Sequence, residues 1–283
     1  VFRLLVELLL APYLYLVLTN PAYRPKRSNI LIAILVFLGV EALATIFGAD
    51  PLRSFWGNHE RMMGLYAYAH IVLFFLIATS VYRTKEEWRG LIFYAILAGA
   101  IVTGLGYVQY FSTSFLHEVK GGRIYSTFGN SIYLSAYLLF QIYLLFWYAL
   151  GEKRSLYKII LYLLLGLEII AFFWARTRGA FIALIASGTI LIFLAAWHKL
   201  RSRPKLLAGI ILFPIILIFL LFILKDIPAI KKNKFLSPIT QLSSQEVTAK
   251  TRLLNWKIGL HAWSSRPLLG WGPENYYFGF NKF

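Results

Sequence analysis

Long apolar runs of membrane-spanning length limit the folds that this chain can adopt. A helix that crosses the hydrocarbon core of a bilayer needs about 20 mostly apolar residues. Only 14% of the 283 residues are charged, against about 25% in soluble domains. We therefore expect an all-α integral membrane protein, a polytopic helix bundle with about eight transmembrane helices. The predicted spans are Phe2–Leu18, Asn29–Phe47, Leu65–Tyr82, Gly90–Phe111, Ser131–Leu150, Tyr157–Ala175, Ala180–Trp197 and Leu206–Leu224.

The basic residues alternate in density between successive connectors. The formal net charge of +17 would suggest nucleic-acid binding in a soluble protein, but here most cations lie between apolar runs. The connectors N-P-A-Y-R-P-K-R-S, Y-R-T-K-E-E-W-R, G-E-K-R-S-L-Y-K and H-K-L-R-S-R-P-K are the more basic set. By the positive-inside rule they face the cytoplasm, so the other connectors and the C-terminal segment face outside. We expect membrane lipid, and no nucleic acid, as a partner.

The last part of the chain differs in composition from the rest. Residues 1–225 are predicted to form the helix bundle, and the polar, proline-punctuated residues 226–283 the first part of a long outer loop. Within this loop, Thr251–Ser264 places four large apolar residues on one helical face, which predicts an amphipathic surface helix. These residues are Leu253, Trp256, Leu260 and Trp263. The chain starts inside an apolar run and stops without a closing signal, so we expect a fragment truncated at both ends.

Two arginines occupy the short corner F-W-A-R-T-R-G-A-F-I-A-L on the outer side. A single arginine at a helix end can extend to water or headgroups. Arg176 and Arg178 together, followed by Gly179 and a new helix, instead favour an anion. Guanidinium groups bind phosphate oxygens bidentately, and a helix start offers unpaired N–H groups. We predict that this corner binds phosphate.

The outer connector S-F-W-G-N-H-E-R-M-M-G contains an acid, a base and a cation. His59, Glu60 and Arg61 lie together at the outer mouth of the predicted bundle. A functional site and a re-entrant turn in which Glu60 merely pairs with Arg61 explain this spacing equally well.

A further outer cation, Arg123, lies in the stretch G-R-I-Y-S-T-F-G-N-S-I-Y. Gly129 and Asn130 are expected to shape a turn or to cap the following helix. For Asn130 alone, capping is the favoured interpretation.

Two polar residues fall inside predicted spans. Glu41 is an intramembrane acid, which suggests either function or a structural pair with Arg3 or an outer arginine. His70 is expected to be a hydrogen-bonded histidine of the bundle. There is no cysteine, and we expect no metal site and no cofactor.

Taken together, these motifs resemble the O-antigen ligase and O-antigen polymerase superfamily. They are R-T-R-G-A, S-F-W-G-N-H-E-R-M-M-G-L, S-T-F-G-N-S-I-Y-L-S-A-Y and R-x-L-N-W-x-I-G-L-H-A-W-S-S-R-P-L-L-G-W-G-P-E-N-Y. The resemblance implies a multi-pass protein of the bacterial inner membrane whose active site faces the periplasm. It implies a metal-independent, inverting glycosyltransferase that uses an undecaprenyl-diphosphate-linked glycan. The acceptor would be lipid A–core in a ligase and another lipid-linked glycan in a polymerase.

The resemblance transfers to individual residues only where the motifs match. It implies that Arg178, Arg176, Arg61, Arg252 and Arg123 bind the donor diphosphate, supported by Glu60, Gly129, Asn130 and Gly179. Ser131 and Ile132 depart from the family's G-N-P-N-Y-like pattern after Asn130. The family's catalytic base is a histidine farther along the outer loop, which we expect beyond Phe283, so the catalytic residue is unknown.

Other functions are compatible with outward-facing arginines. A flippase for lipid-linked glycans would need them too, but should show pseudo-symmetric halves or broken helices. A peptidoglycan polymerase would share the lipid diphosphate donor. A purely structural scaffold would not need clustered outer cations.

Overall fold

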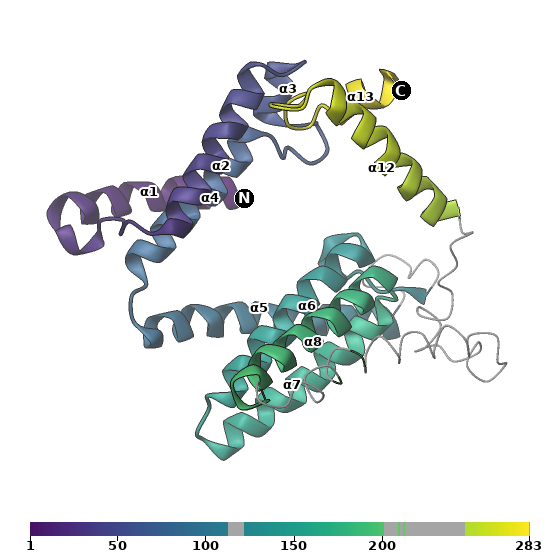
Figure 1. Ribbon diagram of the computed structural model, residues 1–283. Coiled ribbons are helices and arrows are strands. Elements are labelled where there is room, and N and C mark those ends of the chain that lie inside the picture. Colours follow the sequence, from purple (N-terminus) through teal and green to yellow (C-terminus); the bar gives the residue numbers. More distant parts are fainter. Residues whose placement is uncertain (113–121, 201–208, 210–211, 213–246, 283) are drawn as a thin grey trace. The chain divides into compact units, whose positions relative to one another are not determined.

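The protein is helical throughout the part of the chain that the structure describes. The computed structural model describes residues 1–112, 122–200, 209, 212 and 247–282, which contain helices and turns but no strand (Figure 1). The elements are α1 (Phe2–Thr19), η1 (Pro21–Tyr23), α2 (Asn29–Ile46), α3 (Pro51–Trp56), α4 (Leu65–Val81), α5 (Lys85–Phe111), η3 (Ser126–Phe128), α6 (Ser131–Leu150), α7 (Ser155–Trp174), α8 (Arg178–Leu200), α12 (Val247–Ser265) and α13 (Tyr276–Lys282).

The predicted polytopic helical fold is confirmed. Six of these helices, α1, α2, α5, α6, α7 and α8, are long and apolar enough to cross a membrane. The predicted span in α4 is also a helix, but with 17 residues it is shorter. Most of the eighth predicted span, Leu206–Leu224, lies outside the described residues.

Local sequence signals set where several helices begin. The Asp50 side chain accepts a hydrogen bond from the backbone N–H of Arg53, and Pro51 occupies the first turn of α3. At the start of α5, Thr84 and Glu87 form a reciprocal capping box with bonds of 2.9 and 3.2 Å. These caps satisfy N–H groups that lack partners at a helix start.

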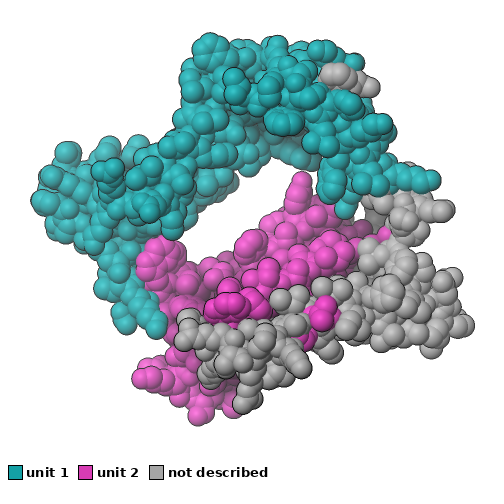
Figure 2. All heavy atoms as spheres, in the orientation of Figure 1, with its two compact units in different colours: residues 1–87, 244–283 teal, residues 88–243 magenta. Residues whose placement is uncertain are grey.

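The described residues form two compact units, which Figure 2 shows in different colours. Unit 1 comprises residues 1–87 and 244–283, and unit 2 comprises residues 88–243. The predicted boundary between the bundle and the outer loop, at residue 226, lies outside the described residues and stays a prediction.

In unit 1, polar contacts fasten the C-terminal segment to α3. Asn275 is fully buried, and its Nδ2 donates to the carbonyls of Asp50 and Trp271 and to the Ser54 hydroxyl, at 3.2, 3.0 and 2.8 Å. The Ser54 hydroxyl in turn donates to the Pro273 carbonyl. Residues more than 200 positions apart in sequence are therefore held together by one buried amide.

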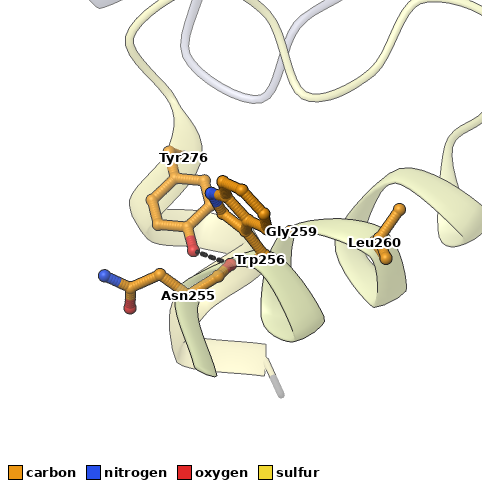
Figure 3. Close-up of a pocket in the computed structure, with 5 residues that line it drawn as sticks. All are labelled: Asn255, Trp256, Gly259, Leu260 and Tyr276. Carbon is orange, nitrogen blue, oxygen red and sulfur yellow. Dashed lines mark hydrogen bonds between the residues drawn. The ribbon is translucent and has the colours of Figure 1, made fainter. Parts of the chain in front are cut away.

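The predicted amphipathic helix lies within α12. Its four predicted face residues, Leu253, Trp256, Leu260 and Trp263, are all at least 59% exposed, whereas Ala262 is buried against α13. The Tyr276 hydroxyl donates to the Asn255 carbonyl beside a pocket of about 450 Å³ lined by Asn255, Trp256, Gly259, Leu260 and Tyr276 (Figure 3). One face of α12 thus packs within unit 1, and its apolar face stays uncovered in the described structure. Its position on the outer membrane surface stays a prediction.

The two polar residues predicted inside the membrane spans of unit 1 differ in their contacts. His70 is buried, with Nδ1 2.7 Å from the Tyr66 carbonyl and Nε2 3.0 Å from Glu7 Oε1, which confirms a hydrogen-bonded bundle histidine. Glu41 is half-buried and takes no part in the two ion pairs found among the described residues. The proposed pair with Arg3 is not formed, because Arg3 lies over the Tyr66 ring and contacts the Met62 sulfur.

Replacing Asn275 with alanine should loosen the attachment of α12 and α13 to α3. The substitution removes three hydrogen bonds and leaves the Ser54 hydroxyl short of a donor, which should cost about 1–3 kcal/mol. Thermal unfolding together with hydrogen exchange at α3 measures the effect. Asn281→Ala, at an exposed asparagine of α13, is the matched control, and equal behaviour of the two variants would contradict this role.

Candidate anion-binding site

The corner between α7 and α8 is held in a defined shape by its apolar surroundings. α7 ends at Trp174 and α8 begins at Arg178. Arg176 between them has a φ of 45°, a left-handed conformation that is uncommon for residues other than glycine. Ala175 and Phe172 are almost fully buried, and Phe181 packs on the Phe172 ring at 5.6 Å. A different backbone conformation at the corner would expose these apolar side chains. The conformation of the corner therefore depends on the core of unit 2.

Arg123 reaches this corner from a distant part of the sequence. Its Nε donates to the Ala175 carbonyl at 3.2 Å, and its Nη2 donates to the Thr177 hydroxyl at 3.3 Å. The backbone N–H of Ile124 adds a bond to the Trp174 carbonyl. A Cβ built on Gly122 would lie 3.5 Å from Arg176 Nη1, so the Arg176 guanidinium lies against this glycine. The segment before η3 and the α7–α8 corner therefore form one site.

Three cations share the corner. Burial lowers the pKa of Arg123, and the neighbouring charges of Arg176 and Arg178 lower that pKa further. Neither of the two ion pairs among the described residues includes Arg123 or Arg176. Such an excess of guanidinium charge suits an anion with several oxygen atoms.

The Thr177 hydroxyl links the corner to the start of α6. It accepts hydrogen bonds from Arg123 and from the Ser135 hydroxyl at 2.8 Å, and it lies 3.2 and 3.3 Å from the carbonyls of Ala175 and Ser131. Ser135 is fully buried. The position of Arg123 therefore depends on two hydroxyl groups and on the first turn of α6.

The segment that carries Arg123 is itself held from α5. The side-chain carbonyl of Gln109 is buried and accepts hydrogen bonds from the backbone N–H groups of Tyr125 and Ser126, both at 2.9 Å. The Ser126 hydroxyl donates to the Val102 carbonyl at 2.7 Å. Arg123 thus projects from an anchored segment.

Gly129 and Asn130 form the beginning of α6. Gly129 ends η3 with a φ of 67°, and the Asn130 side chain accepts from the backbone N–H of Ile132 at 2.8 Å. The favoured capping interpretation of Asn130 is confirmed. Any contribution of the two residues to ligand binding stays a prediction, and it would act through the Ser131 carbonyl next to Thr177.

Gly179 lies in the first turn of α8, beside Arg178. It is exposed, and a Cβ at this position would meet no atom within 4 Å. Its small size is therefore not needed for packing within the described structure, and its supporting role stays a prediction.

The other predicted site residues belong to unit 1. Glu60 and Arg61 are exposed and do not form an ion pair with each other. The Arg61 backbone N–H donates to the Asn58 side chain in a tight turn where Gly57 and Gly64 approach closely. Arg252 lies on the exposed surface of α12. The structure brings together Arg123, Arg176 and Arg178, whereas the participation of Arg61 and Arg252 in the same site stays a prediction.

One outer arginine has a structural role that the sequence does not reveal. Arg53 donates through Nε to the Glu274 carbonyl at 3.1 Å, and its guanidinium lies 4.3 Å from the centre of the Tyr277 ring. Ser135 and Gln109, which hold the arginine cluster, were not predicted either. Ser135 follows Ser131 by one helical turn, and this spacing of hydroxyl residues in an apolar helix was the available signal.

Comparison with known proteins supports the family resemblance over part of the chain. A family model described as O-antigen ligase matches residues 161–283. The resemblance to the O-antigen ligase superfamily is confirmed. The matched stretch contains the α7–α8 corner and α12. No curated protein and no solved structure matches the chain. Similarity to this family suggests a multi-pass membrane protein with glycan transfer of the ligase or polymerase type.

Removing the Thr177 hydroxyl should weaken anion binding at the corner. Thr177→Val keeps the side-chain shape but deprives Arg123 of one hydrogen bond. A bond to a charged group contributes about 1.5 kcal/mol, so affinity for inorganic diphosphate should fall about tenfold. Calorimetric titration measures this affinity. The control is Thr189→Val in α8, where the hydroxyl only donates to the Ile185 carbonyl; an equal effect of both variants would argue against the corner.

Proposed function

We propose that this protein transfers a glycan from undecaprenyl diphosphate to a sugar hydroxyl of an acceptor at the periplasmic face of the bacterial inner membrane. The observation that carries the proposal is the convergence of Arg123, Arg176 and Arg178 at one corner of unit 2. A diphosphate offers several anionic oxygens, which matches the number and geometry of the guanidinium donors.

The arginines would act on the leaving group. As the bond between the anomeric carbon and the phosphate oxygen breaks, the undecaprenyl diphosphate gains negative charge. Arginines fixed before the reaction stabilise this charge more in the transition state than in the ground state. The hydrogen bonds from Arg123 to the Ala175 carbonyl and the Thr177 hydroxyl supply such fixation.

The beginning of α8 supports the same assignment. Arg178 and Gly179 lie in its first turn, where helix N–H groups lack intrahelical acceptors and the helix dipole is positive. The open space beside Gly179 leaves room for a bulky phosphate group near these N–H groups.

The remaining chemistry is a single displacement. A base removes the proton of the acceptor hydroxyl, the oxygen attacks the anomeric carbon from the side opposite the diphosphate, and the configuration is inverted. We propose a histidine of the long outer loop as this base, as the family resemblance implies. In this scheme guanidinium groups neutralise the diphosphate without a metal ion.

The periplasmic placement rests on the alternation of charge along the sequence. The segment with Arg123 and the α7–α8 corner both belong to the less basic set of connectors, which the positive-inside rule assigns to the outer side. The connector with Glu60 and Arg61 belongs to the same set.

The acceptor distinguishes two variants of this function. A ligase would use lipid A–core, and a polymerase would use another lipid-linked glycan. The arginine corner would bind only the donor, so both variants of the function would use it in the same way. Assays with each acceptor separate the two variants.

Replacing Arg178 with alanine in the full-length protein should greatly reduce glycan transfer. Loss of one preorganised donor to the leaving group costs on the order of 10²–10³ in rate. The test uses protein reconstituted in liposomes with an undecaprenyl-diphosphate glycan and an acceptor. Arg154→Ala, at an exposed arginine just before α7, controls for the loss of one positive charge and should keep near-normal activity.

Two outcomes would contradict the proposal. Near-normal transfer by a correctly inserted Arg178→Ala protein would remove this residue from the mechanism. Movement of the lipid-linked glycan across the bilayer without bond formation would instead assign the protein to flippases.

A further inference from the structure

A glutamate lies inside the helix bundle of unit 2 without a hydrogen-bond or ion-pair partner among the described residues. Glu168 is in the second half of α7 and is fully buried. Neither of its carboxyl oxygens has a hydrogen-bond partner, and neither of the two ion pairs among the described residues includes it. An ionised carboxylate in such a place has a very large desolvation cost. The side chain must therefore hold something that neutralises it.

A polar neighbour of Glu168, Gln141, has a buried oxygen that lacks a hydrogen-bond donor. Gln141 of α6 donates through Nε2 to the Ala95 carbonyl at 3.0 Å and to the Tyr137 hydroxyl at 2.8 Å, but its Oε1 is buried and has no donor. A Cβ built on Gly99 of α5 would lie 2.8 Å from Gln141 Oε1 and 3.1 Å from Glu168 Oε1. Two acceptor oxygens thus lie close to the same glycine.

We propose that Glu168 is a protonated carboxylic acid in the folded protein and that its O–H donates to Gln141 Oε1. One proton then removes the buried charge and satisfies the unpartnered oxygen of Gln141. The bond joins α7 to α6 across Gly99 of α5. The titratable neighbour on α6, Tyr137, is uncharged at neutral pH and adds no counter-charge.

A metal ion in place of the proton would need more ligands. Hard cations such as Ca²⁺ take about 6–8 oxygen ligands. Here Glu168 and Gln141 provide three unpartnered oxygens, and Thr103, one turn along α5 from Gly99, adds one more buried hydroxyl without a partner. A single proton needs only one of these oxygens as acceptor, so it fits the groups that are present better than a metal ion does.

The proposed bond acts as a positioning contact for the arginine corner. Gln141 follows Ser135 by six residues on α6, and Glu168 precedes Trp174 by six residues on α7. The Glu168–Gln141 bond would therefore fix α7 against α6, and the Ser135–Thr177 hydroxyl bond fixes the corner that follows α7 against the same helix. This inference concerns the protonation state of Glu168, so it can fail while the proposed glycan transfer holds.

Infrared difference spectroscopy tests the proton directly. The full-length protein in lipid nanodiscs at pH 6, where exposed glutamates are ionised, is compared with its Glu168→Gln variant. The wild-type spectrum should contain a carboxylic-acid C=O band that the variant lacks, and addition of Na⁺ or Ca²⁺ should leave the band unchanged. Glu41→Gln, at the half-buried acid of α2, is the control and should retain the Glu168 band.

Two spectral outcomes would overturn the proposal. A difference spectrum that shows only carboxylate bands at pH 6 means that Glu168 is ionised. Loss of the acid band on addition of Na⁺ or Ca²⁺ means that the site binds a cation in place of the proton.

Variants at Gly99 test the contact without removing the acid. In Gly99→Ala the new methyl group would lie 2.7–3.1 Å from Gln141 and Glu168, so the hydrogen bond must lengthen and the acid C=O band should shift. Gly104→Ala on the same helix meets no atom within 4 Å and should leave the band in place. An unshifted band in a folded Gly99→Ala protein would overturn the assignment of Gln141 as acceptor.

The melting temperatures of two Glu168 variants test whether the neutral side chain stabilises the fold through a hydrogen bond. Glu168→Gln keeps a donor and should melt close to wild type, whereas Glu168→Leu leaves Gln141 Oε1 without a donor and should lower the melting temperature clearly. If Gln and Leu were equally damaging, the neutral hydrogen-bond role would be wrong.

Discussion

Mutual repulsion among guanidinium groups is the constraint on which the α7–α8 corner depends. Arg176 and Arg178 are close in sequence, whereas Arg123 comes from a distant segment and is repelled by their positive charges. It stays there because its donors bind the Ala175 carbonyl and the Thr177 hydroxyl, and because its segment is anchored by Gln109. The repulsion is thus balanced by neutral hydrogen bonds. Under the proposed function, an anion bound at the corner would relieve that repulsion.

Arginines in similar sequence contexts make different contacts in the folded protein. Arg89 pairs with Glu152 at 3.7 Å and lies over the Tyr148 ring, and Arg53 binds the Glu274 carbonyl. In both cases the guanidinium group already makes a tertiary contact. Among the described residues, the hydrogen bonds of the Arg123 side chain go to neutral oxygens, which supports its proposed role in anion binding. Sequence spacing identifies which arginines face outward, but only the folded chain shows which of them already have a partner.

The helices were predictable because bilayer thickness dictates their length. Seven of the predicted apolar segments are helices in the described residues, with ends within a few positions for most of them. The closeness of Arg176 and Arg178 was also predictable, since a single residue, Thr177, separates them in the sequence. The contacts of Ser135, Gln109 and Glu168 were not predictable, because each polar side chain has its observed or proposed partner in a distant part of the sequence. Apolar periodicity carries no information about rotation and register between such helices.

Register between α6 and α7 is therefore the property that connects the membrane interior to the candidate site. Helices in lipid gain little from apolar contact alone, and polar contacts fix their relative rotation. Along α6, Ser135 and Gln141 are separated by about 9 Å at the usual helical rise. Between these levels lies the buried Leu138. A slip of α7 by one residue would break both polar contacts at once and would move the Thr177 hydroxyl away from Arg123. The corner keeps its geometry because two buried hydrogen bonds, one of them completed by a proton, exclude neighbouring registers.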